Sequence, residues 1–401
     1  MSILYISYDG MLEPLGQSQV LGYLKRLAVD RSIHLISFEK GVDWHNVAEH
    51  KGILQDIAYS GIVWHPLRYH KRPSSIATLW DILCGISVGI WLVLRHRMRI
   101  VHARSYVASV MALVLKRLTG VKFLFDMRGF WADERVDGGL WPAGGCLYRV
   151  AKWFERQFLL HADCVVSLTQ AAVDEMRTFP YLQGCMPSFE VITTCTDLKL
   201  FRLAQVDSLL NMVDRPFTLG YVGSVGVWYL FDETLRCFKL LRERVPNARL
   251  FILNRGAHDY VRGRLLALNI DADSVYLEEA DHAGVAHAMQ LMDAGIFIIK
   301  SVYSKMASAP TKLGEFLGCG VPCLGNSGVG DMAAILELEQ VGVALHSFDE
   351  KAMRQAIDSL LQLTKTEGIR GRCRKVALRY FSLDQGVRRY ASVYERLDAH
   401  S

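Results

Sequence analysis

The chain lacks the cysteine patterns of disulfide-bonded and zinc-binding proteins. Its nine cysteines are scattered along 401 residues, with no Cys-x-x-Cys pair and no Cys/His ligand spacing among them. A disulfide framework and a zinc site are therefore not expected, whereas a reducing compartment is. The chain opens directly as a strand, residues 3–7, without a basic and apolar leader, so we expect a cytoplasmic protein.

Strong charge, low complexity and internal repeats are missing as well. The formal net charge of +5 is too small to indicate a nucleic-acid partner. Hydrophobic residues make up 51% of the chain and charged residues 22%, with only 10 prolines, which excludes a disordered or collagen-like protein. No unit of about 20–50 residues repeats. Because domains cluster near about 100–200 residues, the length of 401 residues indicates two of them.

One apolar segment, residues 73–94, carries a single charge, that of Asp81. Its uncharged part, 82–94, is too short for a spanning helix, which needs about 20 apolar residues. The surrounding stretch 51–122 holds eleven Lys and Arg residues against two Asp residues. A basic-flanked apolar helix suits the surface of an anionic membrane, and we expect peripheral contact through residues 73–99. The alternative is a buried domain helix with solvated ends.

Short apolar strands alternate with amphipathic helical stretches, for example 17–28, 106–118 and 148–160. In the first half, strands are expected at residues 3–7, 34–38, 62–66, 100–103, 122–126, 164–168 and 190–193. In the second half, strands are expected at residues 218–222, 249–253, 275–277, 294–299, 321–325 and 342–345. Strands of about five residues separated by helices of about 10–15 residues indicate βαβ units and parallel sheets.

The alternation is interrupted once, by a linker-like span at residues 197–216. We therefore expect an α/β protein with two facing Rossmann-like domains and a ligand cleft at the carboxyl ends of their strands. The first domain is expected at residues 1–200 and the second at 212–380. No strand separates the last two helices, so residues 381–401 are expected to cross back to the first domain.

The densest chemical pattern is Ser-Ala-Pro-Thr-Lys-Leu-Gly-Glu-Phe-Leu-Gly-Cys-Gly-Val-Pro, residues 308–322. Pro310 suits the first turn of a helix, where its missing N–H has no consequence. At about 100° per residue, Thr311, Lys312 and Glu315 share one side of this helix. Free N–H groups at a helix N-terminus, together with a lysine, form a seat for a pyrophosphate, and Glu315 could accept two hydrogen bonds from a ribose diol. A solvated Lys-Glu pair on a surface helix is the alternative.

This stretch resembles the donor-site motif of glycosyltransferase family 4, which contains retaining nucleotide-sugar enzymes of GT-B fold. Glu315 and the Gly-Val-Pro at 320–322 match the second of the family's two motif glutamates and the strand that follows it. The position of the first glutamate is occupied by Ala307. The Ser-x-Pro-Thr-Lys opening at 308–312 is similar to that of some relatives.

The loop after the first strand of the second domain is similar to the family's donor loop. Its Gly223 and Ser224 would let the backbone approach a phosphate. Many members carry Arg and Lys just after this strand, but residues 227–229 are Val-Trp-Tyr. The remaining expected donor ligands are therefore Asn254, Arg255, Pro310, Thr311, Lys312 and Glu315.

Six residues of the first domain are expected to border the acceptor, because they follow strands whose carboxyl ends face the cleft. They are Gly16, Gln17, His102, Arg104, Asp126 and Arg128. His102 is the best placed of the thirteen histidines for catalysis, although a lone histidine at a strand end is more often structural. For Arg104, Asp126 and Arg128, a structural Arg–Asp pair is equally open.

The resemblance implies a retaining transfer from a nucleotide-diphosphate sugar, without an obligatory metal or a further cofactor. Lys312 and Arg255 would stabilise the leaving diphosphate and Glu315 would hold the ribose, so these three form the expected catalytic set. The acceptor would be a saccharide or lipid-linked saccharide in cell-surface polysaccharide or glycoconjugate assembly, at the inner face of the cytoplasmic membrane. The alternatives are a GT-B sugar-nucleotide epimerase and a non-catalytic GT-B binding subunit, which Ala307 would suit.

Overall fold

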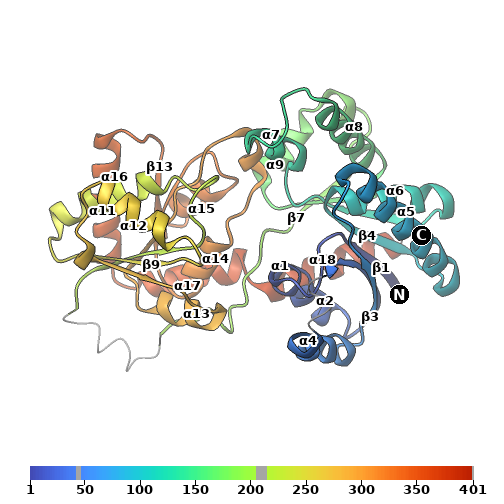
Figure 1. The fold of residues 1–401 in the computed structure, drawn as a ribbon, viewed down its shortest axis with the longest axis horizontal. Coiled ribbons are helices and arrows are strands. Elements are labelled where there is room, and N and C mark those ends of the chain that lie inside the picture. Colours follow the sequence, from blue (N-terminus) through green and yellow to red (C-terminus); the bar gives the residue numbers. More distant parts are fainter. Residues whose placement is uncertain (42–46, 205–214, 400–401) are drawn as a thin grey trace. The chain divides into compact units, whose positions relative to one another are not determined.

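The computed structural model describes residues 1–41, 47–204 and 215–399 and divides into two compact units (Figure 1). Unit 1 contains Met1–Thr193 and Gly386–Ser401, and unit 2 contains Thr194–Gln385. Residues 205–214 of the expected linker lie outside the described part. Each unit is a parallel sheet covered by helices, which confirms the predicted α/β fold class.

The sheet of unit 1 has seven parallel strands in the order β3-β2-β1-β4-β5-β6-β7. Their bounds are β1 Ser2–Ser7, β2 Ser32–Glu39, β3 Val63–Arg68, β4 Ile100–Arg104, β5 Lys122–Asp126, β6 Cys164–Ser167 and β7 Ser188–Val191. All seven overlap predicted strands, and β7 overlaps the prediction at residues 190–191. β1 is central and pairs in register with both neighbours, Leu4 facing His34 of β2 and Val101 of β4. Its side chains are buried because helices cover both faces of a parallel sheet.

Right-handed crossovers decide which face each helix covers. The chain runs outward through β1, β2 and β3 and then, from β4 onward, in the opposite direction, so α5, α6 and α8 lie together on one face. The other face carries α2 and α18, whose Tyr23 and Tyr390 rings meet at 5.6 Å. The helical segments of unit 1 are α1 Pro14–Gly16, η1 Gln17–Leu21, α2 Gly22–Leu27, α4 Val47–Tyr59, α5 Ser74–His96, α6 Ser105–Thr119, α7 Trp131–Asp137, α8 Cys146–His161, α9 Gln170–Arg177, η2 Pro180–Leu182 and α18 Leu383–Ala399.

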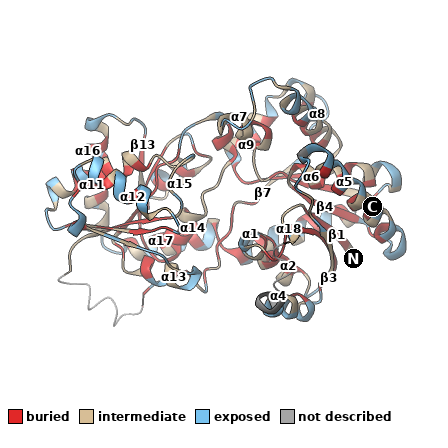
Figure 2. Cartoon of the chain, viewed as in Figure 1, coloured by how far each residue is buried: buried red, intermediate tan, exposed pale blue. Residues whose placement is uncertain are grey.

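Unit 2 contains a six-stranded parallel sheet in the order β10-β9-β8-β11-β12-β13. The strands are β8 Thr218–Val222, β9 Arg249–Leu253, β10 Val275–Glu278, β11 Ala294–Ile296, β12 Cys323–Asn326 and β13 Gly342–Leu345. The helical segments are α11 Phe231–Arg244, α12 His258–Ala267, η3 Ala272–Ser274, α13 His282–Gln290, η4 Tyr303–Ala307, α14 Thr311–Gly318, α15 Met332–Leu338, α16 Glu350–Thr364 and α17 Ile369–Tyr380. One apolar core joins the sheet to α13, α14, α15 and α17, and a second joins it to α11, α12 and α16 (Figure 2).

Two predicted elements differ from the structure. The helix expected at 17–28 begins as the π-helical turn η1 and becomes α-helical only at Gly22. The strand expected at 294–299 ends at Ile296. Beyond it, the side chain of Asn326 makes the hydrogen bonds to Ile299 that the backbone of the neighbouring strand would otherwise make. Its Oδ1 accepts a hydrogen bond from the Ile299 N–H at 2.8 Å and its Nδ2 donates to the Ile299 carbonyl at 2.9 Å.

Three histidines lie against each other in unit 1. His34 Nδ1 lies 3.1 Å from His65 Nε2, and the rings of His34 and His96 are 4.4 Å apart. Burial, with the nearby His96 and His65, lowers the pKa of His34 to about 4. An unfolded histidine binds a proton below about pH 6.5. The unfolded chain therefore binds more protons between these values, and the stability that neutral His34 contributes is lost as the pH falls from about 6.5 toward 4.

We expect His34→Gln to flatten the decline of the free energy of unfolding between about pH 6.5 and 4.5, because the variant has no buried imidazole at this position to protonate. Urea unfolding at several pH values measures this. The exposed Val29 of the same unit provides the control, since Val29→Gln removes no ionisable group and should keep the wild-type pH dependence. Equal slopes in the wild type and His34→Gln would contradict the assignment.

Candidate functional site

In unit 2 the strand order reverses between β8 and β11, and ligands of open α/β sheets bind beside such a point at the carboxyl ends of the strands. Gly223 directly follows β8, and Asn254 directly follows β9. The N-terminus of α14 reaches the same edge, because a Cβ atom on Gly223 would lie 3.3 Å from Lys312 Cε. The topology thus brings together three of the predicted donor segments.

Glycine is favoured at position 223 by its backbone conformation as well as by the nearby Lys312. Its φ of 128° is one that residues with a Cβ rarely adopt. Asn254 fixes this loop, since its Nδ2 donates to the Gly223 carbonyl at 2.8 Å while its Oδ1 accepts from the Ala257 N–H at 2.9 Å. Tyr221 adds a hydrogen bond from its hydroxyl to the Ser224 carbonyl at 2.7 Å. The loop is therefore held in shape by unit 2 itself.

Lys312 and Glu315 form an ion pair with 3.2 Å between Nζ and Oε2. The alternative of a solvated pair on a surface helix does not fit Glu315, which is only 4% exposed. The Tyr229 hydroxyl lies near both: burial raises its pKa, Lys312 opposes the rise and Glu315 adds to it. Lys312 keeps part of its side chain accessible, so it can exchange its carboxylate partner for an anion at the N-terminus of α14.

The remaining predicted donor residues border this pair. The helix begins at Thr311, so Pro310 occupies the N-cap rather than the first helical turn as predicted. Its extended ψ of 120° fits a residue that precedes the helix. Arg255 lies on the surface after β9, and its Nη2 donates to the Ala280 carbonyl at 3.3 Å. A single long hydrogen bond leaves its other donors available to a ligand.

Lys305 was not predicted from the sequence, and its partner Trp228 lies in the loop after β8. Its ammonium lies 3.7 Å from the centre of the Trp228 ring, and the Trp228 carbonyl accepts a hydrogen bond from the Lys300 N–H at 2.8 Å. These contacts join the loop after β8 to the segment after β11. The signal for this contact was the departure from the family pattern at residues 227–229. An aromatic residue such as Trp228 in place of a basic one indicates a packing partner from another segment.

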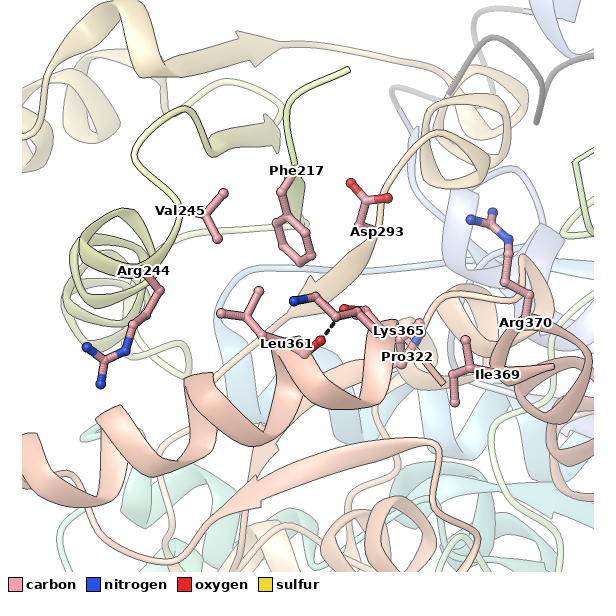
Figure 3. Close-up of a pocket in the computed structure, with 10 residues that line it drawn as sticks. Phe217, Arg244, Val245, Asp293, Pro322, Leu361, Lys365, Ile369 and Arg370 are labelled. Carbon is pink, nitrogen blue, oxygen red and sulfur yellow. Dashed lines mark hydrogen bonds between the residues drawn. The ribbon is translucent and has the colours of Figure 1, made fainter. Parts of the chain in front are cut away.

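A cavity of about 500 Å³ lies at the opposite edge of the unit 2 sheet (Figure 3). Its lining residues Phe217, Asp293 and Pro322 precede β8, β11 and β12, so they mark the amino ends of these strands. Asp293 is already paired with Arg215 at 2.7 Å. Because ligands of this architecture bind at the carboxyl ends, this cavity is not the candidate donor site.

In unit 1 the strand order reverses between β1 and β4, which marks a second candidate edge. Arg104 ends β4, and its Nε lies 3.8 Å from the carboxylate of Asp9, which follows β1. Gly16 is required here, since a Cβ atom would lie 2.0 Å from the Gly10 carbonyl oxygen. Gln17 holds the same loop by donating from Nε2 to the Leu12 carbonyl at 3.0 Å.

His102 and Asp126 are 1% and 2% exposed, and both contact α18. His102 Nδ1 lies 2.7 Å from the Tyr394 hydroxyl, and the Tyr390 hydroxyl donates to Asp126 at 3.0 Å. Burial lowers the pKa of His102, whereas Asp126 opposes this. These contacts favour the structural role that the sequence left open, and acceptor binding by the two side chains stays a prediction.

Arg128 lies at the same edge, with its Nη1 3.9 Å from Asp126. Its φ of 59° and that of Ser105, 67°, are in the left-handed region that non-glycine residues rarely adopt. Strained backbone of this kind gathers at binding and catalytic sites. The two residues follow β5 and β4, so the strain lies at the carboxyl edge of the sheet.

Two buried carboxylates that shape this edge were also not predicted as site residues. Glu39 ends β2 and accepts hydrogen bonds from the N–H groups of Met11 and Leu12 at 2.8 and 3.2 Å. Asp81 of α5 accepts from the Tyr8 hydroxyl at 2.9 Å and pairs with His70 Nδ1 at 2.6 Å. An acidic residue within an apolar run is the signal that could have indicated such a buried role.

Two Rossmann-like units and a C-terminal helix that returns to the first unit define the GT-B class of protein. Solved structures share this fold over the whole chain. A glycosyltransferase from Rickettsia africae is 14% identical, covering 100% of this chain and 99% of that one, with a TM-score of 0.73. Sucrose-phosphate synthase from Thermosynechococcus elongatus is 15% identical with full coverage of both chains and a TM-score of 0.69. Anabaena HepE in complex with UDP-glucose is 14% identical, covering 99% of this chain and 100% of that one, with a TM-score of 0.68.

Residues 52–181 match the family described as Glycosyl transferase 4-like domain. The resemblance predicted from sequence is thereby confirmed, and the chain carries a glycosyltransferase domain. The match lies in unit 1, whereas the motifs that indicated the resemblance lie mainly in unit 2. No curated protein matches the chain.

Proposed function

We propose that this protein transfers a sugar from a nucleotide-diphosphate sugar to a saccharide or lipid-linked saccharide. The observation that carries the proposal is the approach of Lys312 to Gly223 where the strand order of unit 2 reverses. A lysine, a helix N-terminus and a glycine that leaves its backbone open converge there. This combination binds a diphosphate through charge and N–H groups.

In the proposed mechanism Lys312 and the N-terminus of α14 stabilise the negative charge that develops on the departing diphosphate. Arg255, on the adjacent loop, adds a second cation. Glu315 holds the ribose through its two hydroxyls, once Lys312 has turned toward the phosphates. Transfer with retention needs no protein base if the leaving phosphate accepts the proton of the acceptor hydroxyl. No metal is required, because cationic side chains perform the electrostatic work.

The donor class is supported by a structural relative, since HepE was solved with UDP and with UDP-glucose. The acceptor is proposed to bind unit 1 near Arg104, Asp126, Arg128 and the loop around Gly16. A lipid-linked acceptor fits the apolar helix α5, through which the protein would contact the inner face of the cytoplasmic membrane. The pathway would be assembly of a cell-surface polysaccharide or glycoconjugate.

Thermal unfolding with UDP-, GDP- and dTDP-sugars tests the donor class. We expect one of these donors to raise the midpoint, because a ligand present at about 100 times its Kd stabilises by about 2.7 kcal/mol. The corresponding nucleoside without its diphosphate is the control and should have a much smaller effect. Equal effects of the nucleoside and the nucleotide sugar would contradict the diphosphate site. Conversion of the donor to an isomer without any acceptor would instead indicate an epimerase.

A further inference from the structure

Helix α5 packs on α6 through one side only. Gly85 and Gly89 allow this close approach. A Cβ atom on Gly85 would lie 2.4 Å from Met111 Sδ, and a Cβ atom on Gly89 would lie 2.8 Å from a Leu115 methyl carbon. By length and composition, Ser75–His96 is the one helical segment in the described part of the chain that could cross a membrane. The packed side shows instead that α5 belongs to the helical layer of unit 1.

The opposite side of α5 carries a stripe of large apolar side chains, each at least half exposed. Trp80 and Trp91 are 57% and 56% exposed. The other members at helical spacing are Ile76, Leu79, Leu83 and Leu94. Scattered exposed apolar residues are ordinary in soluble proteins, but a continuous stripe with two tryptophans marks an interaction surface.

Large exposed apolar side chains are also present on the other two helices of the same layer. Helix α6 lies between α5 and α8, and the buried Tyr106 of α6 donates a hydrogen bond to Glu155 of α8. The outer side of α8 exposes Leu147, Val150 and Trp153, the last at 53%, and α6 exposes Leu118. Among the described residues, every tryptophan in the exposed class lies on α5 or α8.

The exposed charged side chains of these three helices are all basic. The three helices contain two carboxylates, Asp81 and Glu155, and both are buried. The basic and histidine side chains of the helices are Arg95, His96, Lys116, Arg117, Arg149, Lys152, Arg156 and His161. Trp and Arg side chains on one face are typical of proteins that lie in the interface of an anionic bilayer.

Asp81 excludes the spanning orientation. Its carboxylate is fully buried and bound to Tyr8 and His70, so α5 cannot enter the hydrocarbon without exposing a charge there and breaking unit 1 apart. A helix fixed in this way can only lie along the membrane surface with its outer side in contact.

We infer that the outer face of the α5–α6–α8 layer is one docking surface for an anionic lipid bilayer. Trp80 and Trp91 anchor it on α5, and Trp153 anchors it on α8. This rests on the proposed function, which places only residues 73–99 at the membrane, and extends it to α8. Two anchors on separate helices fix the orientation of unit 1 on the bilayer, which a single helix could not do.

The test is co-sedimentation of the full chain with phosphatidylcholine vesicles, with and without phosphatidylglycerol. Wild type should bind the anionic vesicles and be released by salt. We expect Trp80→Glu and Trp153→Glu each to weaken binding by about tenfold or more, because burial of a large apolar side chain is replaced by a repelled carboxylate. Tyr59→Glu on α4 is the matched control, since Tyr59 is exposed on another face.

The outcomes separate the two proposals. If Trp153→Glu and Trp153→Ala both bind the anionic vesicles as strongly as the wild type, the three-helix surface is overturned. If only Trp80→Glu loses vesicle binding, contact through α5 alone remains. If both Glu variants bind as strongly as the wild type, or if the wild type does not bind at all, both the contact through α5 and its extension to α8 are overturned. A variant that binds vesicles weakly should still show the wild-type rise of its midpoint of thermal unfolding when the nucleotide sugar is added. That result would show that the variant is folded and that its proposed donor site is intact.

Discussion

Replacement of Lys312 by alanine should lower the turnover of sugar transfer by about two to three orders of magnitude, which is the usual effect of removing one well-placed donor from a developing negative charge. Lys312 lies at the N-terminus of α14 beside Gly223, and no other described lysine approaches that backbone. The measurement is the initial rate of transfer from the nucleotide sugar that raises the midpoint of thermal unfolding.

Two controls define what a loss would mean. Lys312→Arg keeps the charge and should retain much of the rate, although its planar group fits the site differently. Arg255→Ala should cost less than Lys312→Ala, because Arg255 lies on the exposed side of the loop. A Lys312→Ala variant with wild-type turnover would contradict the diphosphate assignment.

Replacement of Arg374 by alanine should destabilise unit 2 by about 3 kcal/mol and lower its midpoint of thermal unfolding by about 6–12 °C. The Arg374 guanidinium of α17 donates to three carbonyls, those of Phe201 at 2.6 Å, Leu198 at 2.8 Å and Gly318 at 2.9 Å. Gly318 ends α14, so this cation also satisfies the negative end of the helix whose other end carries the proposed donor site.

Differential scanning calorimetry measures this effect, with Arg262→Ala on α12 as the matched control. Arg262 is exposed and pairs only with its own helix neighbour Asp259, so its removal should leave the midpoint unchanged. Equal midpoints in Arg374→Ala and Arg262→Ala would show that the three carbonyls are satisfied by other groups.

The strands of both units could be predicted because a parallel strand is buried on both faces and reads as a short apolar run. The motif at residues 308–322 was visible for a similar reason, since a helix start and its polar residues are adjacent in sequence. The early end of β11 was not visible. It depends on the side chain of Asn326, which belongs to another strand.

The roles of charged residues divide in the same way. From sequence, Asp81 only interrupted an apolar run, and Lys312 and Glu315 could equally have formed a solvated pair. Their burial decides otherwise, and burial is produced by segments far away along the chain: Tyr8 and His70 around Asp81, and Tyr229 beside Lys312 and Glu315. A carboxylate or amine takes its chemical character from such surroundings.

The sequence by itself determined the α/β class, the two parallel sheets and the segments proposed to bind the donor, because each depends on local periodicity or on neighbouring residues. Only the tertiary structure decided that His102 and Asp126 are held by tyrosines of α18, and that α5 and α8 present their apolar sides in one layer. The physical reason is that a side chain's partners and its exposure are set by the packing of distant elements, and no local pattern records that packing.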